Sequence, residues 1–109
     1  MTNVLIRRAR SGEYLGFSCS GHTGFADRGE DIVCAAVSVL VINTVNSLEL
    51  LAGERFHTTV NEEEGLIDCR FVPPINEKSR LLLDSMVLGL QEIRKQYGTT
   101  YIDLIFEEV

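Results

Sequence analysis

The stretch DIVCAAVSVLVINTVNSLELLAG, residues 31–53, decides the fold that we predict for this chain. It reads as one helix from Ile32 to about Ala52, with Asp31 as the N-terminal cap and Gly53 at the C-terminal end. The first half of this helix is apolar on nearly every side, and such a helix has to be buried. We therefore expect the rest of the chain to supply a sheet against which it packs.

Shorter segments on both sides of this helix predict that sheet. The predicted strands are residues 3–8, 13–19, 55–61, 66–72 and 99–106, and the first four form two hairpins. A second, amphipathic helix begins at Ile75 or Asn76 and ends before Gly98. The predicted fold is α/β: a single compact domain over residues 1–109 with ββαββαβ order, a five-stranded sheet and two helices.

Composition and charge exclude several classes of protein. The 109 residues include 16 acidic and 10 basic side chains, and a net charge of −6 disfavours direct binding of nucleic acid and favours a basic protein as partner. The start of the chain lacks an apolar leader, which predicts a cytoplasmic location. The strongly apolar residues 32–42 fall short of the roughly 18 that a membrane span needs, so we expect no membrane association.

One of the three cysteines stands in a chemically suggestive place. With Asp31 as cap, Cys34 falls in the first turn of the helix, where unpaired N–H groups favour a thiolate and an oxyanion. His22 lies 12 residues earlier in a glycine-bearing loop and is the plausible base, because strand alternation puts His57 on a polar face. Ser38, one turn after Cys34, would offer a hydrogen bond, and Asp31 would cap the helix or orient the histidine.

Other interpretations of these residues remain open. A cysteine in an apolar helix is commonly a core residue, and a histidine between glycines is commonly a solvated turn residue. Cys19 and Cys69 alternate with apolar residues and are predicted to be packed thiols, although together with His22 and Cys34 they would make a set of zinc ligands. A thiol redox protein would need a close cysteine pair, and an RNA-binding or non-catalytic ribosome-associated module would carry a basic face.

The segment GHTGFADRGEDIVCAAVS, residues 21–38, resembles the signature of the Prp family of ribosomal-processing cysteine proteases. In that signature a Gly-His pair precedes a Gly-x-Asp-x-Val-Cys-Ala-Ala-Val-Ser segment. The resemblance implies a catalytic dyad of His22 and Cys34, supported by Asp31 and Ser38, with no metal or other cofactor.

The same resemblance implies a substrate and an assembly. Family members are homodimers that remove the N-terminal extension of a precursor, large-subunit ribosomal protein number twenty-seven, cutting after paired phenylalanines. The loop that we expect over residues 20–30 would then act as a lid over the aromatic pair. Its mobility would come from Gly21, Gly24 and Gly29.

Overall fold

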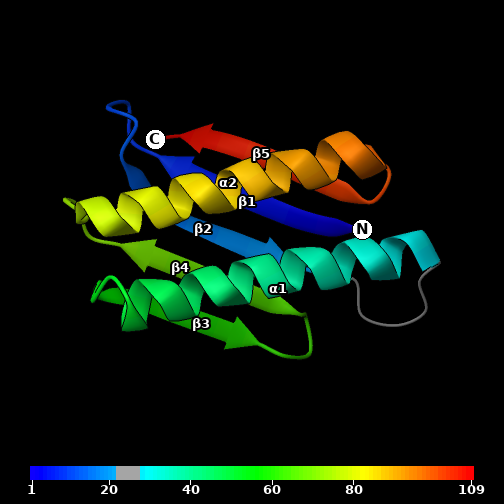
Figure 1. The fold of residues 1–109 in the computed structure, drawn as a ribbon, viewed down its shortest axis with the longest axis horizontal. Helices are drawn as coiled ribbons and strands as arrows, with labels where there is room; N and C mark the ends of the chain where they lie inside the picture. The colour runs from blue at the N-terminus through cyan, green and yellow to red at the C-terminus, as the bar shows by residue number, and fades with distance from the viewer. Residues whose placement is uncertain (22–27) are drawn as a thin grey trace.

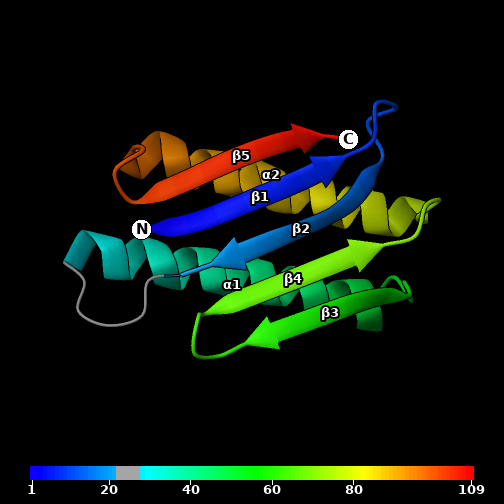
Figure 2. The same ribbon diagram turned by 180° about the vertical axis from the view of Figure 1, so that it is seen from behind.

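The computed structural model describes residues 1–21 and 28–109 of the chain, except the side chains of Arg28 and Glu30. Its elements are β1 (Thr2–Arg8), β2 (Tyr14–Ser20), α1 (Arg28–Leu50), β3 (Phe56–Asn61), β4 (Leu66–Phe71), α2 (Glu77–Tyr97) and β5 (Ile102–Glu108). This order confirms the predicted ββαββαβ arrangement. Both helices cover one face of the sheet, and Figure 2 shows that neither crosses the opposite face (Figures 1 and 2).

The strands lie in the order β3-β4-β2-β1-β5. β1 pairs antiparallel with β2 and parallel with β5, whereas β4 pairs antiparallel with both β2 and β3. The described part of the chain therefore leaves β3 and β5 as the two edges of the sheet. Helix α1 crosses the β2, β4 and β3 side of the sheet, and α2 lies over β1 and β5 (Figure 1).

Helix α1 supplies a large part of the core. Val33, Val37, Val41 and Leu48 are fully buried, at helical spacing, facing the sheet. The expectation that α1 is buried against a sheet is confirmed, although its outer side is open to solvent, where Val39 is 71% exposed. The apolar residues of α1 form a wide stripe, and the sheet covers only one side of it.

The length of α1 also corrects the expectation about membrane spans. The stretch Asp31–Leu50 is long and apolar enough to cross a membrane, with a mean hydropathy of 1.7. Core helices that pack on a sheet pass the same test of length and composition, and a third of this stretch is buried inside the fold. The hydropathy of α1 is therefore weak evidence for a membrane location.

Helix α2 has the ends that the sequence predicts. Asn76 is the N-cap, and its side chain accepts a hydrogen bond of 2.8 Å from the backbone N–H of Ser79. Gly98 is the C-cap with φ of 83°, a conformation that favours glycine, and its N–H donates to the carbonyl of Arg94. Both signals are local, which explains why the sequence located them.

Candidate active site

Helix α1 begins one turn earlier than predicted. Its first residue is Arg28, so Asp31 is inside the helix and is not its cap, and Gly29 is helical rather than part of a loop. The extra turn packs on the segment before β5: a Cβ added to Gly29 would lie 2.7 Å from the ring of Tyr101. A Cβ at this position would displace the end of the Tyr101 side chain, so Gly29 permits the close packing of a turn that local signals did not predict.

The earlier start changes the chemistry available to Cys34. This residue lies six positions after Arg28 and so belongs to the second turn of α1. Backbone N–H groups in the second turn bond to carbonyls four residues back, and the helix dipole acts mainly within the first turn. The prediction that unpaired first-turn amides surround the sulfur of Cys34 and hold an oxyanion was therefore wrong.

The structure instead places Cys34 against the end of β2. A Cβ built on Gly21, the residue that follows β2, would lie 3.2 Å from Cys34 Sγ. The Gly21 N–H donates a 3.2 Å hydrogen bond to the carbonyl of Gly65, in the turn between β3 and β4. The absence of a side chain at Gly21 therefore makes room for the sulfur, and two strands fix the backbone beside it.

The partner predicted for this sulfur lies outside the described residues. His22 directly follows Gly21 in the chain, and both His22 and Gly24 fall in residues 22–27, as does most of the loop predicted as a lid. The ends of that predicted loop are regular structure, because Ser20 belongs to β2 and residues 28–30 belong to α1. The dyad therefore stays a prediction, although Gly21 brings the chain to the sulfur just before His22.

The other two thiols are packed, as the sequence predicted. Cys19 is 6% exposed, and burial, together with the nearby Cys34, raises the pKa of its thiol from 9.0 to about 11. Cys69 is fully buried, and burial raises the pKa of its thiol too, although a contact with Thr58 lowers it in part. All three cysteines are free, and Cys34 is the half-buried one. It is the least buried of the three.

The two residues predicted to support the site are neighbours of Cys34 on the helix surface. Asp31 precedes it by three positions and Ser38 follows it by four, the spacings at which helix side chains lie next to one another. Asp31 is exposed and Ser38 is half-buried. With its role as cap excluded, Asp31 is an exposed carboxylate one turn before the sulfur.

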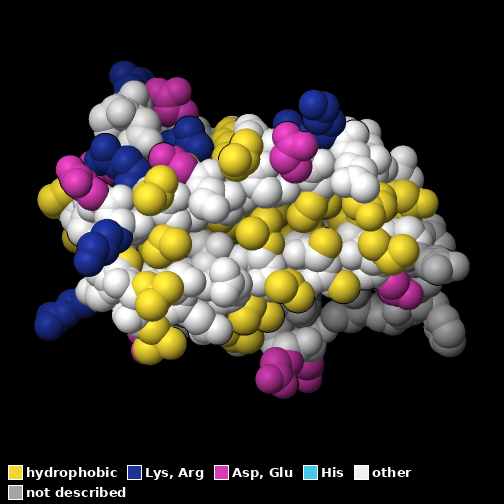
Figure 3. All heavy atoms as spheres, viewed as in Figure 1, with side chains coloured by type: hydrophobic (Ala, Val, Ile, Leu, Met, Phe, Trp, Pro, Cys, Tyr) yellow, Lys and Arg dark blue, Asp and Glu magenta, His cyan; other side chains and the backbone are white. Residues whose placement is uncertain are grey.

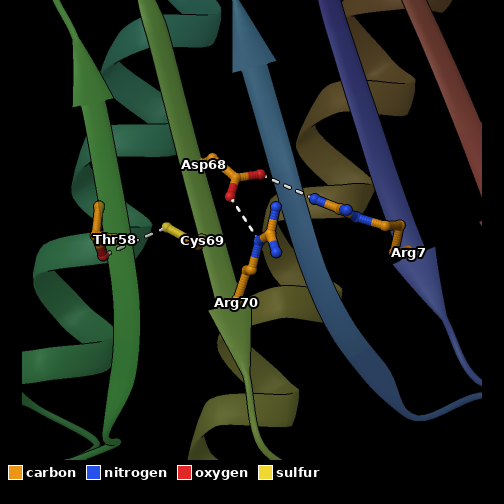
Figure 4. A network of polar contacts seen from close by, with 5 residues as sticks. All are labelled: Arg7, Thr58, Asp68, Cys69 and Arg70. Carbon is orange, nitrogen blue, oxygen red and sulfur yellow. Dashed lines mark hydrogen bonds and ion pairs between the residues drawn. The ribbon is translucent and has the colours of Figure 1, made fainter.

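A polar network lies on the helix-free face of the sheet, and sequence analysis missed it (Figure 4). Asp68 of β4 accepts from Arg7 of β1 at 2.8 Å and from Arg70 at 3.0 Å. The surface is hollowed beside this network, and the hollow is lined by Ser18, His57, Thr59, Leu66, Asp68 and Arg70. His57 is therefore on the polar face, as alternation predicted, and the sheet separates it from the helix layer that holds Cys34.

No metal site is formed by the residues that the structure describes, since nowhere do three or more His, Cys, Asp or Glu side chains converge. The alternative zinc set includes His22 and so falls partly outside them. What the described residues do hold together is a half-buried thiol on a core helix, next to a glycine at a strand end. A thiol held in this way is a candidate nucleophile, so the class of protein to compare with is the cysteine-dependent enzymes.

Comparison with known proteins narrows this class. The family model for the cysteine protease Prp matches residues 1–103. The ribosomal processing cysteine protease Prp of Bacillus subtilis is 33% identical over 101 residues, which cover 89% of this chain and 90% of that protein. The chain therefore belongs to the Prp family of cysteine proteases.

Solved structures agree with this assignment. The essential ribosomal processing protease Prp of Staphylococcus aureus, in complex with a substrate peptide, has a TM-score of 0.90 and 28% identity. The match covers 98% of this chain and all of that one. The same S. aureus protease with a covalently linked product peptide gives a TM-score of 0.86 and 29% identity, again over 98% of this chain and all of that one.

Proposed function

We propose that this cysteine protease removes the N-terminal extension of large-subunit ribosomal protein number twenty-seven, cleaving after paired phenylalanines. The observation that carries the proposal is the position of the half-buried Cys34, whose sulfur lies against Gly21; both residues belong to the segment that resembles the family signature. Two comparisons support this proposal. A curated relative is named a ribosomal processing cysteine protease, and one solved structure of the S. aureus protease holds a covalently linked product peptide.

The proposed reaction is nucleophilic catalysis by a Cys-His dyad. His22 takes the proton of the Cys34 thiol, and the sulfur attacks the scissile carbonyl carbon to form an S–C bond. The C–N bond then breaks, His22 returns the proton to the leaving amine, and the mature protein departs. Water attacks the acyl-enzyme and releases the extension, which regenerates the thiol. This sequence requires no cofactor.

The residues beside Cys34 have proposed supporting roles. We propose that Ser38, one turn later, donates a hydrogen bond toward the site and that Asp31, one turn earlier, orients the imidazole of His22. An unpaired carboxylate close to the sulfur would oppose its ionisation, so orienting His22 is the better role for Asp31.

We further propose a cytoplasmic homodimer. Hydrophobic side chains gather along the helix layer (Figure 3), where Val39 of α1 and Leu81 and Leu88 of α2 are each at least 60% exposed. Exposed apolar surface of this kind is typical of interfaces.

The net charge of −6 suits a basic ribosomal protein as substrate better than it suits RNA. Sedimentation analysis and cell fractionation test the assembly and the location.

The central experiment is incubation with the extended ribosomal protein, followed by mass analysis of its N-terminus. Cys34→Ala should abolish cleavage in a folded protein, whereas Cys69→Ser serves as the matched cysteine control. His22→Ala should reduce turnover by roughly 10²- to 10⁴-fold, the usual effect of losing a general base. A wild-type protein that binds the precursor without cutting it would favour the non-catalytic ribosome-associated module instead.

A further inference from the structure

A small apolar groove lies between α1 and the β3 edge of the sheet. Its volume is about 170 Å³. The groove is lined by Ile42, Val45, Asn46, Thr58, Val60 and Ile67. Ile42 is 48% exposed and Val60 is 61% exposed, so the rim of the groove presents aliphatic groups to solvent in the described structure.

The groove lies on the same flank of α1 as Cys34. Val45 follows Cys34 by 11 residues, which is three helical turns, and Ser38 lies between them on the same line. Leu40, on the other flank, faces α2, because a Cβ on Gly89 would lie 2.7 Å from it. A peptide held at Cys34 can therefore follow this flank to the groove without meeting α2.

The separation between sulfur and groove sets the length of peptide needed to connect them. Ile42 lies eight residues after Cys34 along α1, a rise of about 12 Å at 1.5 Å per residue. An extended chain advances about 3.3 Å per residue, so about four residues of substrate cover this distance.

The groove has the size for one large apolar side chain. An apolar protein cavity of about 150 Å³ is known to hold one benzene molecule. Aliphatic groups line most of this groove, so a charged or strongly polar side chain would lose its hydration there without gaining a partner.

We propose that this groove binds one large apolar side chain of the substrate, about four residues from the bond that is cut. The inference rests on the proposed protease function and adds a second specificity site to it, separate from the sulfur. Strand β3, an edge of the described sheet, runs beside the groove and offers unpaired backbone groups to an extended peptide.

The test measures binding, so that it does not depend on catalysis. A fluorescent peptide spanning the cleavage site of the extended ribosomal protein is titrated into Cys34→Ala protein, alone and combined with Val60→Asp. We expect Val60→Asp to weaken binding by about 10- to 100-fold, the effect of losing one buried apolar side chain. Val72→Asp, at a valine that is 84% exposed and lines no part of the groove, should change Kd less than about twofold.

A peptide series locates the occupant. Asp replaces each apolar residue of the peptide in turn. Besides the paired phenylalanines at the cut, one position three to five residues from the cut bond should weaken binding to the Cys34→Ala protein. The same peptide should show no further loss with Val60→Asp, because the contact is already gone. Additive losses at every position would overturn the inference.

Methyl NMR of the protein with Val60 intact provides a second test, which is independent of whether the Val60→Asp variant folds. The methyl signals of Ile42, Val45 and Ile67 should shift when the peptide is added, and unshifted signals with a bound peptide would overturn the inference. Cleavage by the wild-type chain is measured separately. If the wild-type chain cleaves the precursor but Val60→Asp leaves peptide binding unchanged, only this inference fails. If the groove binds the peptide and the precursor is not cut, only the proposed function fails.

Discussion

Replacing Gly21 with alanine should impair catalysis while leaving the fold intact. The new methyl group would lie 3.2 Å from Cys34 Sγ, and ordinary contacts of a Cβ begin near 3.4 Å, so the sulfur has to move by a few tenths of an ångström. Gly21 is outside the left-handed region, so alanine fits its backbone conformation. Cys34 Sγ is also the one atom within 4 Å of that methyl group among the described residues.

The magnitude follows from the tolerance of catalytic geometry. A misplacement of 1 Å costs about 100-fold in rate, so a few tenths of an ångström should lower kcat/KM by about three- to tenfold. Folding stability should change by less than about 1 kcal/mol, because alanine also restricts the unfolded chain. The assays are peptide cleavage, alkylation of Cys34 by iodoacetamide and urea denaturation.

Two comparisons separate this effect from general damage. Gly16→Ala would place its Cβ 2.5 Å from the backbone oxygen of Cys69, which cannot yield easily, so this variant should lose stability. Gly21→Ala in the Cys34→Ala background should be at least as stable as its parent, since the sulfur is gone. Wild-type kcat/KM and wild-type alkylation of Cys34 in the Gly21→Ala protein would refute the reasoning.

Three further predictions concern the thiols and the β1–β2 end of the sheet. At pH 8 iodoacetamide should modify Cys34 before Cys19 or Cys69, because burial raises the pKa of both of these thiols; peptide mass mapping showing Cys19 modified first would contradict this. The folded protein keeps the Cys19 proton up to a pKa of about 11 while the unfolded chain loses it above about 9, so the free energy of unfolding should fall between pH 9 and 11. Cys19 alone should contribute about 3 kcal/mol of this fall at most, and Cys19→Ala should make the fall smaller in urea titrations at each pH, while Cys69, whose pKa is also raised, still contributes. Tyr14→Phe removes a buried hydroxyl that donates to Asp84, and should cost about 1–3 kcal/mol by urea denaturation; an unchanged midpoint would show that this hydrogen bond contributes nothing.

Local signals in the sequence were enough for most of the fold. Asn76 and Gly98 mark the two ends of α2 through interactions with residues only a few positions away. The alternation of polar and apolar residues placed His57 on the polar face of its strand. The first turn of α1 contains Gly29, which packs on Tyr101, a residue 72 positions away in the chain. No pattern near Gly29 reveals that contact, so Asp31 was mistaken for the cap.

The same limit applies to the candidate site. The choice of Cys34 as nucleophile came from its segment and stays a prediction, whereas the packing of Cys19 and Cys69, predicted from their alternation with apolar residues, is confirmed. The position of Gly21 against the sulfur of Cys34 requires the strand order and the crossing of α1 over β2. The groove at Val60 likewise joins elements that are distant in the sequence, and the hydrophobic pattern of each element alone does not indicate it.

The Asp68 network has a consequence for how accurately the site is assembled. Asp68 of β4 reaches Arg7 of β1 across the intervening strand β2, so three strands have to be in register for the ion pair to form. A slip of one residue would turn these charges toward the apolar helix layer and shift the end of β2 by about 3.3 Å. Gly21 would then no longer lie beside Cys34. The network on the helix-free face of the sheet thus helps to fix the strand register that places Gly21 beside Cys34, the proposed nucleophile, on the other face.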